Sequence, residues 1–182
     1  MREYILEVKK LIPEKYCEKI ISYFDYDLID AQTTGHGLAK DVRNCKSRNV
    51  MNPETFGERI CSNFIQTKLL ECVGFYKEKY SHFYSDKITS CELLKYQHNK
   101  YKTGYQYHVD MGHKVSDRHA SISICLNNNF QGGEFKFDLP EGEIQMPQNV
   151  GDAIIFPSNF MFPHQVNQIT KGTRYSLVAW VI

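Results

Sequence analysis

The spacing of apolar residues divides the chain into a first half of mainly helical character and a second half of short strands. Residues 4–12 alternate loosely between apolar and polar and predict an opening strand. A helix is predicted to begin near Pro13, a residue that suits the first turn. A second, longer helix is predicted from Pro53 to about Tyr80, although Gly57 and Gly74 weaken the expectation that it is unbroken.

After residue 88, short runs rich in β-branched and aromatic residues alternate with turn signals. These predicted strands are Ile88–Tyr96, Tyr105–Val109, Ala120–Leu126, Gly133–Phe137, Glu143–Met146, Ala153–Phe156 and Arg174–Ile182. Closely spaced short strands are typical of a sandwich or barrel. Helices followed by strands predict an α+β fold, with the helices packed on one face of the β unit. We expect one domain over residues 1–182, in which 1–87 is mainly helical support and 88–182 is the β core with the active site.

The segment between the two predicted helices is less regular. Residues 33–37, which include His36, have the composition of a loop. Residues 41–44 are consistent with a short strand from which Arg43 faces a pocket. The sequence gives no function to the rest of residues 25–53.

Composition narrows the classes of function. The chain has 22 Lys and Arg against 21 Asp and Glu, and no basic block reaches five residues, so a nucleic-acid partner is disfavoured. Its apolar runs are too short for a membrane span, and residues 1–10 lack the apolar core of a signal peptide. Six cysteines without metal-binding spacing indicate free, mostly buried thiols. A reducing, cytoplasmic location is therefore expected.

Two separated stretches carry candidate chemistry. His108 and Asp110 lie two residues apart near a predicted strand end, so their side chains point to one face and can reach one ion. Imidazole and carboxylate together suit a divalent metal such as iron. Such a pair is common by chance, and a third ligand must come from elsewhere. His164, in a segment braced by Pro157 and Pro163, is the best candidate.

Arg174 follows His164 by ten residues on the last predicted strand. Alternation places it on one face with Ser176, Val178 and Trp180. A guanidinium on the inward face of a barrel requires a partner. A dicarboxylate co-substrate would supply one through a bidentate contact; the alternative is an internal Asp or Glu, with Trp180 as part of the core.

Together these motifs resemble the Fe(II)/2-oxoglutarate-dependent dioxygenases, and within them the prolyl 4-hydroxylase-like branch. The family pattern is HxD followed by a distal His, with Arg or Lys nine or ten residues later and Trp on the same strand. The matching phrases are Thr103–Asp110, Pro163–Val166 and Thr173–Trp180, with Gly132–Glu134 and Gly151–Pro157 in support. The similarity covers residues 91–182 well, whereas 1–90 match only as flanking helices.

The resemblance implies a double-stranded β-helix, a jelly-roll or cupin-like core, with a catalytic iron held by His108, Asp110 and His164. It implies that Arg174 holds the far carboxylate of 2-oxoglutarate and that O2 is the oxidant, with ascorbate as a supporting reductant. Hydroxylation then releases succinate and CO2. The presence of Asp110 favours hydroxylation over halogenation, which needs that carboxylate replaced.

The family's assisting tyrosine has two candidates here, Tyr96 and Tyr101, and neither spacing to His108 matches fully. Cys125 stands where hypoxia-factor-type relatives have another tyrosine, and Tyr96 or Ser176 would compensate. Trp180 completes the expected co-substrate face. The loop from Met111 to Arg118 is expected to be mobile and to cover the substrate.

Three classes of function remain at this point. The first is hydroxylation of a prolyl residue in a peptide or protein. The second keeps the chemistry but acts on a free amino acid, a small metabolite or an alkylated nucleic acid; AlkB-like demethylases carry a second arginine where this chain has Trp180. The third is a catalytically silent, cupin-like binding module, which the intact set of His108, Asp110, His164 and Arg174 argues against.

Overall fold

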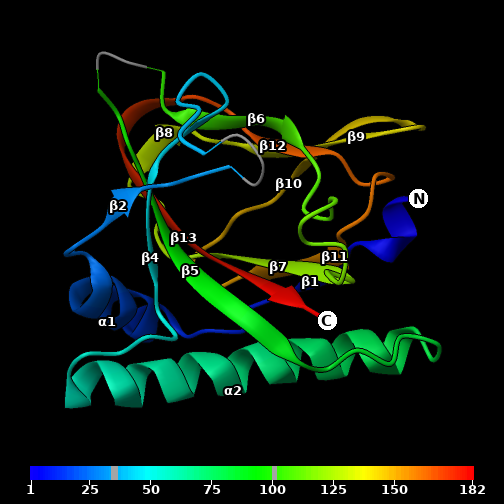
Figure 1. Cartoon of the computed structure of the whole chain (residues 1–182), viewed down its shortest axis with the longest axis horizontal. Helices are drawn as coiled ribbons and strands as arrows, with labels where there is room; N and C mark the ends of the chain where they lie inside the picture. Colours follow the sequence, from blue (N-terminus) through cyan, green and yellow to red (C-terminus); the bar gives the residue numbers. More distant parts are fainter. Residues whose placement is uncertain (34–36, 100–101) are drawn as a thin grey trace.

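The computed structural model describes residues 1–33, 37–99 and 102–182, and consists of two antiparallel sheets with two helices outside the larger one (Figure 1). The helical segments are η1 Arg2–Tyr4, α1 Glu14–Phe24 and α2 Phe56–Lys79. The strands are β1 Leu6–Val8, β2 Ile29–Asp30, β3 Arg43–Asn44, β4 Lys46–Asn49, β5 Ile88–Gln97, β6 Gly104–His108, β7 Ala120–Cys125, β8 Phe130–Gly132, β9 Phe135–Leu139, β10 Gly142–Met146, β11 Ala153–Pro157, β12 His164–Val166 and β13 Ile169–Val181.

The larger sheet has the strand order β1-β11-β7-β13-β5-β4-β2, with β8 paired to β13, and the smaller sheet has the order β10-β9-β12-β6-β3. All the pairs are antiparallel. This is the predicted α+β fold, with a double-stranded β-helix core. Strands from both halves of the chain pair within each sheet.

The two faces of the larger sheet have different surroundings: one packs on the core under the helices, and the other faces the space between the sheets. On β13, Leu177, Ala179 and Val181 are buried in the cluster under α1 and α2. The intervening residues, Arg174, Ser176, Val178 and Trp180, instead line a cavity between the sheets. This is the predicted alternation, and it places one arginine inside the β core.

Helix α2 runs unbroken over 24 residues, along the outside of the larger sheet (Figure 1). Its two glycines do not interrupt it, for different reasons. A Cβ at Gly74 would meet open space, so this glycine only lowers helix propensity. A Cβ at Gly57 would come within 2.7 Å of the Tyr23 ring on α1, so glycine there leaves room for that side chain.

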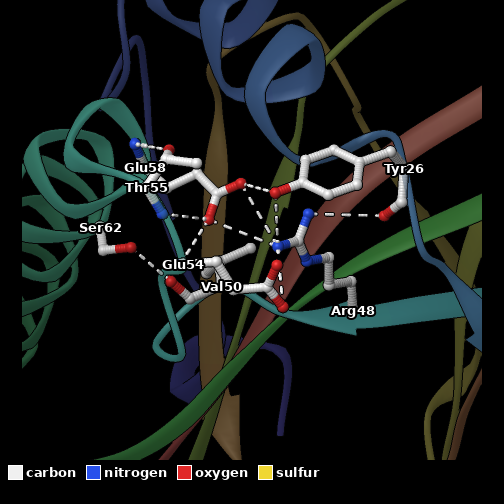
Figure 2. A network of polar contacts seen from close by, with 7 residues as sticks. All are labelled: Tyr26, Arg48, Val50, Glu54, Thr55, Glu58 and Ser62. Atoms are coloured by element: carbon white, nitrogen blue, oxygen red, sulfur yellow. Dashed lines mark hydrogen bonds and ion pairs between the residues drawn. The ribbon is translucent and has the colours of Figure 1, made fainter.

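A buried polar network fixes the start of α2 (Figure 2). The Thr55 hydroxyl accepts from the Glu58 N–H at 3.2 Å, and the Glu58 carboxylate accepts from the Thr55 N–H in return, which forms a capping box. Glu58 also binds Arg48 at 3.3 Å and accepts from the Tyr26 hydroxyl. These contacts tie α2 to β4 and to the end of α1.

We expect Thr55→Ala to lower the free energy of unfolding by about 1 kcal/mol, because it removes the cap of a long helix. Urea denaturation measures this difference. Thr67→Ala is the matched control, since the Thr67 hydroxyl only donates to the Asn63 carbonyl on the exposed side of the same helix. An equal loss in the two variants would contradict the capping role.

For the irregular segment and the second half of the chain, the structure refines two predictions and confirms one. Residues 25–53 contribute β2, β3 and β4, which are too short to show alternation. The expected strand at 41–44 is present as β3, and Arg43 does line the cavity. His164, expected in a loop, begins β12. His36 lies outside the described residues.

All six cysteines are free and buried, as predicted. Neither α1 nor α2, within the described ranges, is long and apolar enough to cross a membrane.

Candidate active site

Two neighbouring strands of the smaller sheet bring together two histidines that are far apart in the sequence. His108, at the end of β6, and His164, at the start of β12, are Cα partners across the antiparallel ladder. Asp110 follows β6 by two residues. Its carboxylate oxygens lie 3.6 Å from Nε2 of His108 and 3.6 Å from Nε2 of His164. One donor atom from each residue lies within 4.8 Å of the other two, a spacing suited to one metal ion.

Backbone carbonyls orient both imidazoles. Nδ1 of His108 lies 2.8 Å from the Gln106 carbonyl oxygen, and Nδ1 of His164 lies 3.0 Å from that of Phe162. A carbonyl can only accept, so each Nδ1 carries the proton and each Nε2 presents a lone pair toward Asp110. This tautomer is the one that metal-binding histidines use when Nε2 is the ligand.

The electrostatics of the site keep the donors ready for a cation. Burial, together with the neighbouring His164, lowers the pKa of His108 to about 3, so its ring is neutral at physiological pH. Burial would raise the pKa of Asp110, but His164 and His108 outweigh it and the pKa is lowered. One carboxylate oxygen, Oδ2, is buried without a hydrogen-bond partner. A buried, ionised oxygen of this kind needs a cation, and these residues fit an iron.

Arg174 lies in the same cavity and is 1 % exposed. Its guanidinium donates to the Gln148 side-chain oxygen at 2.8 and 3.1 Å and to the Ser176 hydroxyl at 2.9 Å. Both partners are neutral, and among the described residues no carboxylate forms an ion pair with it. The alternative prediction, an internal Asp or Glu as the partner of Arg174, is therefore wrong. A buried cation with neutral partners suits an anionic ligand.

A cavity of about 450 Å³ connects the arginine to the triad. Of the other residues expected from the sequence, Tyr96, Ser176 and Trp180 line it, whereas Tyr101 lies outside the described residues. Tyr96 is Cα partner to Arg174, and the Arg174 guanidinium carbon lies 5.4 Å from the Tyr96 ring. Tyr96 is thus positioned beside Arg174.

Cys125 is the Cα partner of Ser176. Its thiol donates to the Asn127 carbonyl at 3.2 Å. Ser176, by contrast, already touches the Arg174 guanidinium. Ser176 is therefore the hydroxyl next to Arg174 on this part of the wall.

The cavity is also lined by side chains that the sequence analysis did not single out as site residues. Arg118 stacks on Trp180, with its guanidinium carbon 3.8 Å from the ring, and donates to the Asp110 carbonyl at 3.2 Å. Glu92, on β5, and Tyr105, on β6, also line the cavity. Of these three residues, only Glu92 lies on the same strand face as Tyr96, which the sequence had already indicated. Alternation along β5 was therefore the one sequence signal that could have placed any of them in the cavity.

Comparison with known proteins agrees with this geometry. Residues 92–182, half of the chain, match the family model of the 2OG-Fe(II) oxygenase superfamily. A PKHD-type hydroxylase of Idiomarina loihiensis is 24 % identical over 181 residues, covering 97 % of this chain and 77 % of that protein. A PKHD-type hydroxylase of Crocosphaera subtropica is 27 % identical over 162 residues, covering 85 % of this chain and 67 % of that protein.

Solved structures show the same fold at low identity. A prolyl hydroxylase of Trichoplax adhaerens, in complex with a hypoxia inducible factor peptide fragment, superposes with a TM-score of 0.83 at 15 % identity, covering 98 % of this chain and 83 % of that one. A prolyl-4-hydroxylase of Pseudomonas putida gives a TM-score of 0.74 at 17 % identity, covering 97 % and 91 %.

The matched region contains the histidines, the carboxylate and the buried arginine in one cavity of a double-stranded β-helix. The chain belongs to the 2OG-Fe(II) oxygenase superfamily and is an oxygenase that depends on Fe(II), 2-oxoglutarate and O2.

Proposed function

We propose that this protein hydroxylates a prolyl residue of a peptide or protein and releases succinate and CO2. In this proposal residues 1–182 act as one catalytic domain. His108, Asp110 and His164 hold Fe(II). Arg174 binds the far carboxylate of 2-oxoglutarate, assisted by Ser176 and Tyr96, and Trp180 closes the same wall nearer the cavity mouth.

The observation that carries the proposal is the burial of Arg174 without an anionic partner among the described residues, in the cavity that the triad also lines. A 2-oxoglutarate molecule has one carboxylate for the guanidinium and a 2-oxo acid end for the metal. Its far carboxylate would therefore neutralise the Arg174 cation, while its other end would bind the metal that neutralises the Asp110 carboxylate.

When bound, iron would supply the activation of O2, of which one oxygen atom converts a C–H bond of the substrate to C–OH and the other oxidises 2-oxoglutarate to succinate and CO2. The residues of the chain bind and orient. The Nε2 atoms of the two histidines and the Asp110 carboxylate would hold the metal, and three protein ligands would leave positions for ligands that exchange. The apolar wall formed by Leu94, Phe135 and Val178 keeps water away from the reacting atoms.

The prolyl substrate is supported by the similar proteins, which are PKHD-type hydroxylases and prolyl hydroxylases, one of the latter in complex with a peptide fragment. A free amino acid or small metabolite would use the same chemistry. The near-neutral charge of the chain disfavours a nucleic acid as the substrate.

We also propose a cytoplasmic location, because six free, buried thiols fit a reducing compartment.

The test is turnover of a proline-containing peptide library with Fe(II), 2-oxoglutarate and ascorbate. Mass spectrometry detects the gain of one oxygen atom on the peptide, and succinate is measured in parallel. We expect both products in matching amounts from at least one prolyl peptide. Succinate formation without any oxidised prolyl peptide, but with an oxidised amino acid, would reassign the substrate. No succinate from the metal-loaded protein would favour a binding module.

A further inference from the structure

One face of the His108 ring is covered by a tyrosine from its own strand. The ring centroids of Tyr105 and His108 lie 3.4 Å apart, with an angle of 14° between the planes. Tyr105 is neither a metal ligand nor a co-substrate contact in the scheme above, which uses only the triad, Arg174 and its neighbours.

A β-bulge creates this contact. On β12 the step from His164 to Val166 is two residues, whereas their partners on β6, His108 and Tyr105, are three residues apart. In a regular strand, residues three apart point to opposite faces. The extra residue in β6 turns Tyr105 to the face of His108, which is a known use of bulges near functional sites.

Arg43 covers the same tyrosine from the neighbouring strand. It is the Cα partner of Tyr105 across β3 and β6, and its guanidinium carbon lies 4.9 Å from the Tyr105 ring centroid. Arg43 is 8 % exposed and is itself held, by the Gln32 carbonyl at 2.8 Å and by Glu92 at 3.4 Å. Because Glu92 belongs to β5, this ion pair links the smaller sheet to the larger one beside the cavity.

We propose that Tyr105 and Arg43 are positioning residues that hold the His108 ring in the orientation that binds metal. This rests on the proposed assignment of His108 as a ligand. The bond from Nδ1 to the Gln106 carbonyl sets the tautomer and the direction of the ring within its plane. The Tyr105 stack opposes rotation out of that plane, and Arg43, whose guanidinium is held by Gln32 and Glu92, holds the tyrosine against the ring.

The experiment measures metal affinity directly, by calorimetric titration of the whole chain with Co(II), a stand-in for Fe(II) that is stable in air. Groups that orient metal ligands contribute about 10- to 100-fold in affinity. We expect a loss in that range for Tyr105→Leu, a smaller loss for Arg43→Gln, and near-normal affinity for Tyr105→Phe, which keeps the ring. The Co(II) absorption spectrum should change only in the variants that lose affinity.

Two further variants separate positioning from general stability. Tyr107→Leu removes a tyrosine from the same strand, where its hydroxyl binds Glu143 on the exposed surface, and it should bind Co(II) normally. In the Tyr105→Leu background, Arg43→Gln should add no further loss, because Arg43 acts through the tyrosine. Thermal unfolding of the metal-free variants checks that each one is folded.

Equal Co(II) affinity in wild type and folded Tyr105→Leu would overturn the inference and leave the proposed function intact. Additive losses in the double variant would also overturn the role given to Arg43. If the wild type itself bound no Co(II), the assignment of the metal site would fail instead.

Discussion

Asp110→Ala is expected to abolish hydroxylation while leaving the fold intact. The carboxylate is the only anionic member of the triad, and its Oδ2 has no protein partner that its removal would strand. Without it, two neutral imidazoles remain for a divalent cation. A metal contributes several kcal/mol to transition-state stabilisation, so turnover should fall on the order of a thousand-fold or more.

Succinate formation with saturating Fe(II) and 2-oxoglutarate measures this loss, and Co(II) titration shows whether it follows from metal binding. Asp138→Ala is the matched control, an exposed carboxylate on β9 of the same sheet. It should retain full activity. A fully active Asp110→Ala variant would remove Asp110 from the ligand set.

The sequence was most informative where chemistry restricts the choice of residue. His108 and Asp110 are two residues apart at the end of a strand, and Arg174 and Trp180 share a strand face by alternation, so both relations follow from local geometry. The pairing of His108 with His164 is different, because it depends on β6 and β12 lying side by side. The motif resemblance supplied that relation, which local geometry alone does not contain.

The features that sequence reading missed depend on contacts between distant strands. The two-residue strand β3 is too short for any periodicity, yet its pairing with β6 places Arg43 over Tyr105. The bulge in β6 reverses the expected face of Tyr105, and nothing in the strand's own sequence marks it. Similarly, Gly57 reads as a weak point of α2 until the ring of Tyr23 is placed against it.

Replacing Arg174 is expected to separate co-substrate binding from folding. In Arg174→Leu, the KM for 2-oxoglutarate should rise about 100-fold, because hydrogen bonds to a charged group contribute about 1.5–3 kcal/mol and 1.4 kcal/mol is tenfold. Arg174→Lys keeps the charge but loses the planar fork, so a smaller rise is expected. Arg59→Leu, at an exposed site on α2, is the control for loss of an arginine.

The same variants make a prediction about stability. The guanidinium is buried among neutral partners, so the fold does not neutralise its charge. Replacing it with leucine removes that unfavourable buried charge, and this gain in stability offsets the loss of the hydrogen bonds. Without ligand, Arg174→Leu should therefore unfold at nearly the wild-type temperature. With Co(II) and 2-oxoglutarate at about 100 times its Kd, wild type should gain about 2.7 kcal/mol. The variant should gain much less from 2-oxoglutarate, and an equal gain would show that Arg174 does not hold the co-substrate.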